Sequence, residues 1–125
     1  MESLFMQSRK AVHNYAAWLE VAQEDLKAAK GLLKLGLFSS VTFHSQQAAE
    51  KSLKAYLIFN EQQILRTHDL LLLLELCLKI DKSFEKIFSA ANYLNPFSTK
   101  FRYPAEYDIP DLSDAKLAIK HAYKI

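Results

Sequence analysis

The residues best suited to chemistry lie along one side of the stretch 44–54. His44, Gln47, Lys51 and Lys54 follow one another at spacings of three and four residues, which places them on one face of a helix. Two ammonium groups one turn apart can neutralise an anionic phosphate, and a glutamine amide can orient it by hydrogen bonds. The same pattern is also typical of the solvated face of an amphipathic helix, so spacing alone leaves both interpretations open.

A second candidate is the segment Arg66-Thr67-His68-Asp69. If it begins a helix, the unpaired N–H groups there carry partial positive charge, and Arg66 and His68 would add to an anion site. Alternatively, Thr67 and Asp69 are capping residues and His68 is held in a local hydrogen bond.

A third candidate is the long loop after residue 95, which contains Lys100, Arg102, Tyr103 and Tyr107. An arginine beside tyrosines can bind phosphate while a ring stacks on a base. Alternatively, the aromatic residues of the loop pin it to the helices while its cations stay solvated.

Several other site types are excluded by what the chain lacks. Two glycines cannot form a phosphate-cradling loop, and no serine-nucleophile motif is present. The four histidines have no metal-ligand spacing, so no metal and no cofactor are expected. Cys77 is the only cysteine, which rules out an intrachain disulfide, and its leucine-rich neighbourhood predicts a buried thiol.

Composition indicates an ordinary globular domain. The 125 residues are 50% hydrophobic and 24% charged, and the formal net charge of +2 is too small to identify a nucleic-acid-binding protein. We therefore expect one domain over residues 1–125. The longest apolar run, residues 70–74, is much shorter than a membrane span, and the N-terminus has no signal pattern. A cytoplasmic location is expected.

Periodicity and capping residues predict the elements that position these side chains. A helix is expected over residues 8–34, with Tyr15 and Leu19 on its apolar stripe, and Gly36 ends it. A second helix should run from a cap at Ser39 or Ser40 to about Asn60.

Three further helices complete the prediction. One is capped by Thr67 and is apolar almost all round over residues 70–78, which suits the middle of a bundle. The next is capped by Asp81 or Ser83 and ends at Asn95-Pro96. The last is short and capped by Ser113, with Leu112 stapled to Leu117. The predicted fold is all-α: an up-and-down bundle of four main helices plus a short C-terminal helix.

Four segments together resemble the HEPN family, the higher eukaryotes and prokaryotes nucleotide-binding domain. The stretch 43–57 reads FHSQQAAEKSLKAYL and is similar to the family signature of an aromatic residue, Gln-Gln-Ala-Ala-Glu-Lys and Leu-Lys-Ala. Residues 22–26 (AQEDL), 67–70 (THDL) and 102–104 (RYP) resemble other landmarks of the family in the same order.

The resemblance implies a helical bundle that forms a homodimer and often pairs with a minimal nucleotidyltransferase in a toxin–antitoxin or stress-response setting. Many members are metal-independent RNases with an Arg followed four to six residues later by a His. Here Arg66 and His68 are separated by one residue, and Arg102 has no histidine before His121. That departure disfavours catalysis, although a second subunit could still complete a site.

The sequence therefore leads to two functional hypotheses. The preferred one is a non-catalytic module that binds a nucleotide or a minimal nucleotidyltransferase partner. Its binding residues would be His44, Gln47, Lys51, Lys54, His68, Arg102 and Tyr103. The alternative is an RNase that acts on RNA, with His68 or His44 as the base and Arg66 as the cation.

Overall fold

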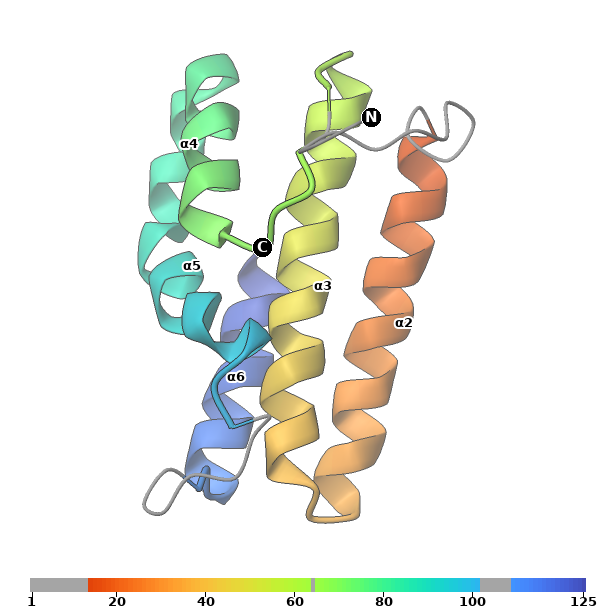
Figure 1. Ribbon diagram of the computed structural model, residues 1–125, viewed down its shortest axis with the longest axis vertical. Coiled ribbons are helices and arrows are strands. Elements are labelled where there is room, and N and C mark those ends of the chain that lie inside the picture. The colour runs from red at the N-terminus through yellow and green to blue at the C-terminus, as the bar shows by residue number, and fades with distance from the viewer. Residues whose placement is uncertain (1–13, 64, 102–108) are drawn as a thin grey trace.

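The computed structural model describes residues 14–63, 65–101 and 109–125. Within them the chain forms five α-helices and two 3₁₀ helices, with no β-strand. They are α2 (Tyr15–Lys34), α3 (Phe38–Phe59), α4 (Leu70–Ile80), η1 (Lys82–Ile87), α5 (Phe88–Leu94), η2 (Asn95–Ser98) and α6 (Leu112–Lys124). The long helices α2 and α3 run antiparallel, with α4 and α5 on the other side of α3 and α6 behind (Figure 1). The predicted all-α bundle is confirmed.

Helix α2 begins and ends at recognisable caps. The side chain of Asn14 accepts a hydrogen bond from the Ala17 amide at 3.1 Å, so the helix begins at Tyr15. The predicted start near residue 8 lies outside the described residues. At the other end Gly36 has φ +74°, a left-handed conformation that glycine adopts without the strain of a Cβ, and it ends the helix as predicted.

Helix α3 lies in the middle of the bundle, where it contacts α2, α4, α5 and α6. We predicted that position for the leucine-rich helix α4, but Leu72 of α4 is exposed on its outer side. The predicted cap at Ser39 or Ser40 is also wrong, because α3 already begins at Phe38 after Leu37, which has no capping side chain. Neighbouring helices approach α3 closely because Ala48, Ala49 and Ala55 present almost no side-chain bulk.

Aspartates, rather than the predicted hydroxyl residues, cap the later helices. Asp69 accepts from the amides of Leu71 and Leu72, and therefore α4 begins after Asp69 and not after Thr67. Asp111 caps α6 in a reciprocal capping box with Asp114, replacing the predicted cap at Ser113. Asp81 is a cap as predicted, but the helix it starts is the 3₁₀ segment η1, and α5 follows separately.

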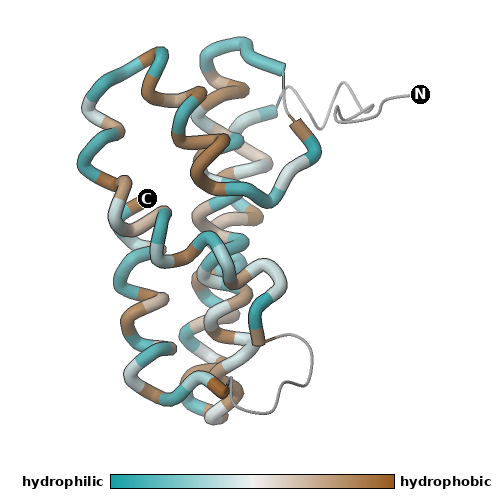
Figure 2. Tube along the Cα trace, turned by 60° about the vertical axis from the view of Figure 1, so that its left-hand side comes forward, coloured by the Kyte–Doolittle hydropathy of each residue, from teal (hydrophilic) through white to brown (hydrophobic). Residues whose placement is uncertain are grey.

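The leucines of α4 complete the main hydrophobic core. Leu70, Leu73 and Leu74 pack with Leu53 and Leu57 of α3, and each of the five residues is at most 1% exposed. In Figure 2 hydrophobic and hydrophilic residues alternate along the helices, as amphipathic packing requires.

Cys77 lies in the same core. Burial raises the pKa of its thiol to about 12, so the sulfur is protonated at neutral pH and unsuited to nucleophilic or metal chemistry. The predicted buried cysteine is confirmed.

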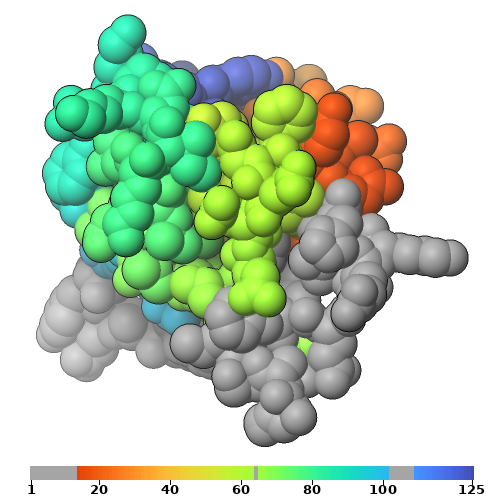
Figure 3. Space-filling model, turned by 90° about the horizontal axis from the view of Figure 1, so that it is seen from above, coloured from red at the N-terminus to blue at the C-terminus, as the bar shows by residue number. Residues whose placement is uncertain are grey.

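The first turns of α2 depart from the predicted core stripe. Tyr15 and Leu19 are exposed, and the Tyr15 ring meets the exposed Phe59 ring edge-on at 5.0 Å. Figure 3 looks onto this end of the bundle, where the start of α2, the end of α3 and the end of α4 lie side by side. The predicted stripe is therefore buried or partly buried only from Ala22 onward.

No helix among the described residues is both long enough and apolar enough to cross a membrane.

Candidate functional site

The polar residues of α3 are mostly inside the bundle. Gln46 is fully buried, Glu50 and Lys54 are each 3% exposed, and Gln47 is 9% exposed. Of the four residues for which a solvated face was the alternative interpretation, that alternative is therefore wrong for Gln47 and Lys54. Buried charges are costly unless they are paired and hydrogen-bonded, so their partners determine what the site can do.

The first group of partners, the Asp25 cluster, joins α2 to α3. One carboxylate oxygen of Asp25 lies 2.8 Å from His44 Nδ1, and the other accepts a hydrogen bond from Lys51 Nζ at 2.8 Å. The Asp25 side chain is 10% exposed, whereas those of Lys51 and His44 are 20% and 31% exposed. The carboxylate is thus buried beneath two basic groups that still reach solvent.

The second group, the Glu50 cluster, joins α3 to the start of α4. Glu50 accepts from Lys54 Nζ at 2.9 Å through one oxygen, and its other oxygen lies 2.8 Å from His68 Nδ1. Gln47 Nε2 also donates to this second oxygen, at 3.2 Å. The Lys54 ammonium lies 5.7 Å from the centre of the Trp18 ring, which gives this buried cation a second favourable contact.

Buried glutamines fix the backbone beside the Glu50 cluster. Gln46 Nε2 donates to the backbone carbonyl of His68 at 2.9 Å, while its oxygen accepts from Gln47 Nε2 at 2.8 Å. Asn95 holds the same turn from the other side, since its oxygen accepts from the Leu70 amide at 2.7 Å. His68 is therefore positioned at both its backbone and its ring, although its side chain is 68% exposed.

A cleft lies beside the Asp25 cluster, between the first turns of α3 and the residues after η2. Its volume is about 360 Å³, and it is lined by Ser39, Ser40, Phe43, His44 and Phe101. This is near the lower end of the range of about 300–1,000 Å³ for small-molecule sites. His44 thus belongs both to the cleft and to the Asp25 cluster.

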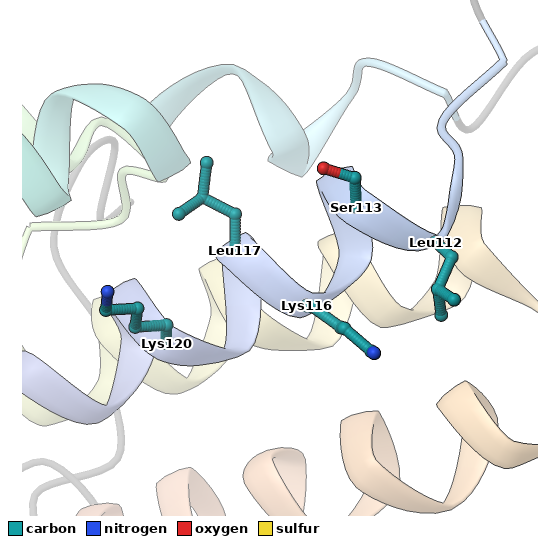
Figure 4. A pocket seen from close by; sticks show the side chains of 5 residues that line it. All are labelled: Leu112, Ser113, Lys116, Leu117 and Lys120. Carbon is teal, nitrogen blue, oxygen red and sulfur yellow. The ribbon is translucent and has the colours of Figure 1, made fainter.

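Two other hollows are poorer candidates. One, of about 440 Å³, is lined only by residues of α6, and Leu117 and Lys120 extend to one side of that helix while Lys116 extends to the other (Figure 4). The second, of about 530 Å³ between α2 and Tyr123, includes the carboxylates of Glu20 and Glu24, which would repel a phosphate. The second hollow also contains Lys27 and Lys30, which offset the charge of these carboxylates and leave it without a net positive charge for a phosphate.

The HEPN domain family matches residues 15–125, which is nearly the whole chain. This chain belongs to the HEPN domain family. Two solved structures share its fold. The protein TT1696 from Thermus thermophilus is 28% identical, with a TM-score of 0.72 over 88% of this chain and 91% of that one. The protein ST0689, an archaeal HEPN homologue, is 26% identical, with a TM-score of 0.75 over 90% of this chain and 91% of that one.

A relative in Methanocaldococcus jannaschii is named "Putative toxin MJ1304". It is 46% identical over 43 residues, which are 34% of this chain and 28% of the relative. The match thus spans little more than a quarter of the relative's length.

The predicted site residues of this HEPN domain fall into three places. His44 and Lys51 lie in the Asp25 cluster; Gln47, Lys54 and His68 lie in the Glu50 cluster. Arg66 is exposed two residues before His68 and makes an interaction of its own. Arg102 and Tyr103 lie outside the described residues.

Sequence reasoning missed the carboxylate at the centre of each cluster, Asp25 in one and Glu50 in the other. Asp25 stands between Ala22 and Ala29, and all three side chains face inward from α2. An acid at a core-facing position of an apolar stripe was the available signal, because it requires a cationic partner. Glu50, four residues before Lys54, was the corresponding signal on α3.

No group of three or more His, Cys, Asp or Glu side chains in the described ranges is arranged to hold a metal ion.

Proposed function

We propose that this HEPN domain binds a phosphate-bearing ligand, a nucleotide, at the Asp25 cluster and the adjoining cleft. The observation that carries the proposal is a pair of partly exposed basic groups, Lys51 and His44, that lie on one buried carboxylate. Of the two, His44 also lines the cleft of about 360 Å³. Asp25 holds the two basic groups side by side, while its own negative charge opposes that of a phosphate.

The Glu50 cluster has a different part in this proposal. Lys54 is almost fully enclosed and its ammonium is held by Glu50, so it supports α3 rather than contacting the ligand. Gln47, which is also buried, supports the same network. Arg102 and Tyr103, which follow Phe101 in the sequence, remain proposed as a second phosphate contact and a stacking ring.

A titration of the protein with ATP and GTP, followed by calorimetry and by amide NMR shifts, tests the proposal. Lys51→Gln removes a charge worth on the order of 1 kcal/mol to a phosphate, so affinity should fall roughly fivefold. Lys79→Gln is the matched control, because Lys79 is an exposed lysine near the end of α4. Absence of heat and of shifts over residues 39–51 would remove nucleotide binding.

The relative named a toxin supports a toxin–antitoxin setting for this chain. In that setting the partner we propose is a minimal nucleotidyltransferase, with the HEPN domain as a homodimer. Phosphate recognition agrees with such a partnership, because nucleotidyltransferases handle the same ligands.

The Glu50–His68 pair favours a second candidate function, metal-independent RNA cleavage. The Glu50 carboxylate beside His68 Nδ1 favours the imidazole tautomer that has its proton on Nδ1. The other ring nitrogen, Nε2, is then free of a proton and can act as a base, and the His68 side chain is 68% exposed. Arg66 two residues earlier would supply the cation for the phosphorane.

Incubation with RNA in EDTA, alone and with the nucleotidyltransferase partner, tests this candidate. His68→Gln should lower cleavage roughly 100-fold or more, because general base catalysis typically contributes that factor. His44→Gln serves as the control for the other candidate base. Intact RNA at micromolar protein under both conditions excludes the enzyme.

A further inference from the structure

The cleft beside the Asp25 cluster is lined by aromatic rings, which a phosphate site does not need. Two aromatic rings, Phe43 and Phe101, line it together with the hydroxyls of Ser39 and Ser40 and the His44 imidazole. Phosphate recognition uses cations and N–H groups and gains nothing from phenyl rings. The lining therefore points to a ligand with a flat, unsaturated part that also accepts and donates hydrogen bonds.

The wall that contains Phe101 is held firmly in place. Its ring stacks on Phe97 with centroids 5.6 Å apart and planes at 25°, and Phe97 is 5% exposed. Phe97 in turn meets Tyr93 edge-on at 5.3 Å. Phe101 also has φ +69°, a conformation that costs an aromatic residue free energy unless its surroundings impose it. A fixed ring loses little freedom when a second ring stacks on it.

The charges around the cleft suit an anionic ligand whose aromatic part enters the cleft. None of the five lining residues is acidic. The Lys100 ammonium lies 5.0 Å from the centre of the Phe101 ring, and Lys51 lies on the same carboxylate as His44. Each of these two lysines thus lies on a group that contacts or belongs to the lining of the cleft, and the lining itself supplies rings and hydroxyls.

We propose that this cleft binds the nucleobase, with Phe43 and Phe101 packing against it and the serine hydroxyls meeting its polar edge. The inference rests on the proposed nucleotide binding and assigns the base to a place within it. Hydroxyls both donate and accept hydrogen bonds, so the cleft tolerates more than one base.

Three probes separate the base from the phosphates: ATP, inorganic tripolyphosphate and adenosine, each titrated into the full chain. ATP should bind at least tenfold more tightly than tripolyphosphate, and adenosine alone should shift the amides of residues 39–44. Phe43→Leu and Phe101→Leu should each weaken ATP binding fivefold or more and leave tripolyphosphate binding unchanged.

Phe59→Leu is the matched control. It removes an exposed phenyl ring from the same helix, 16 residues and so roughly 24 Å beyond Phe43, and it should not change ATP affinity. Phe101→Leu also removes the stacking contact with Phe97, so thermal unfolding of each variant is needed to show that the fold is retained. Phe43→Leu tests the cleft and leaves the Phe97–Phe101 contact in place.

The outcomes distinguish the inference from the function on which it rests. Equal affinities for ATP and tripolyphosphate, unchanged in both leucine variants, would overturn base binding and leave phosphate binding standing. Absence of binding by all three probes overturns both proposals. If adenosine binds and tripolyphosphate does not, the result supports base binding in the cleft and overturns the proposed phosphate contact.

Discussion

Replacing Glu50 by leucine should lower the free energy of unfolding of this HEPN domain by roughly 3–5 kcal/mol. The substitution leaves the Lys54 ammonium, on a side chain only 3% exposed, without its carboxylate. It also removes the acceptor of Gln47 and the anchor of the His68 ring. The cost comes mainly from the stranded cation, since an unpaired buried charge is far less favourable than a paired one.

A double-mutant cycle measured by urea unfolding tests this explanation. Lys54→Met alone should destabilise by a similar amount, because it strands the Glu50 carboxylate, whereas Glu50→Leu with Lys54→Met should recover much of the loss. Glu75→Leu on the exposed side of α4 is the control and should change stability by less than about 0.5 kcal/mol. A single Glu50→Leu variant within about 1 kcal/mol of the wild type contradicts the interpretation.

The spacing of the polar residues on α3 was readable from the sequence, but their burial was not. Lysine, glutamine and glutamate are mostly exposed in proteins, so a helical line of them first suggests a solvated face. What changes the outcome is that α3 lies between α2 on one side and the start of α4 on the other. Whether both sides of a helix are covered is a tertiary property that periodicity within one segment does not contain.

The difference between the predicted and the observed cap of α4 has a tertiary cause. Thr67 and Asp69 both suit a cap, and the structure uses Asp69, whose position is also fixed by the Asn95 amide at 3.1 Å. Thr67 instead accepts a hydrogen bond from the Asp69 amide at 3.1 Å. The choice between two capping residues two positions apart thus depends on Asn95, a side chain far along the chain.

The cleft had no signal in the sequence. Its lining joins residues 39–44 to Phe101, and neither segment alone indicates that the other lies beside it. The loop after residue 95 was a candidate because of Lys100, Arg102, Tyr103 and Tyr107, whereas among its described residues the one that lines the cleft is Phe101.

Asp25→Asn should make the protein less stable and, under the proposed function, a tighter nucleotide binder. The amide cannot pair with Lys51 and His44 as a carboxylate does, and hydrogen bonds to charged groups contribute about 1.5–3 kcal/mol. We expect a loss of about 1–3 kcal/mol, smaller than at Glu50 because Lys51 and His44 can turn to solvent.

The same substitution removes a negative charge beneath the proposed phosphate site and releases both basic groups from it. A unit charge within several ångströms of a phosphate changes the interaction by on the order of 1 kcal/mol, so ATP affinity should rise roughly fivefold. Glu24→Gln changes the net charge equally from the adjacent exposed position and should alter neither quantity appreciably. Calorimetric titration and urea unfolding of the two variants measure both effects. If the folded Asp25→Asn protein binds ATP no more tightly than the wild type, Lys51 and His44 are not the phosphate contacts. In that case the charge of Asp25 would not act on any group that the ligand uses.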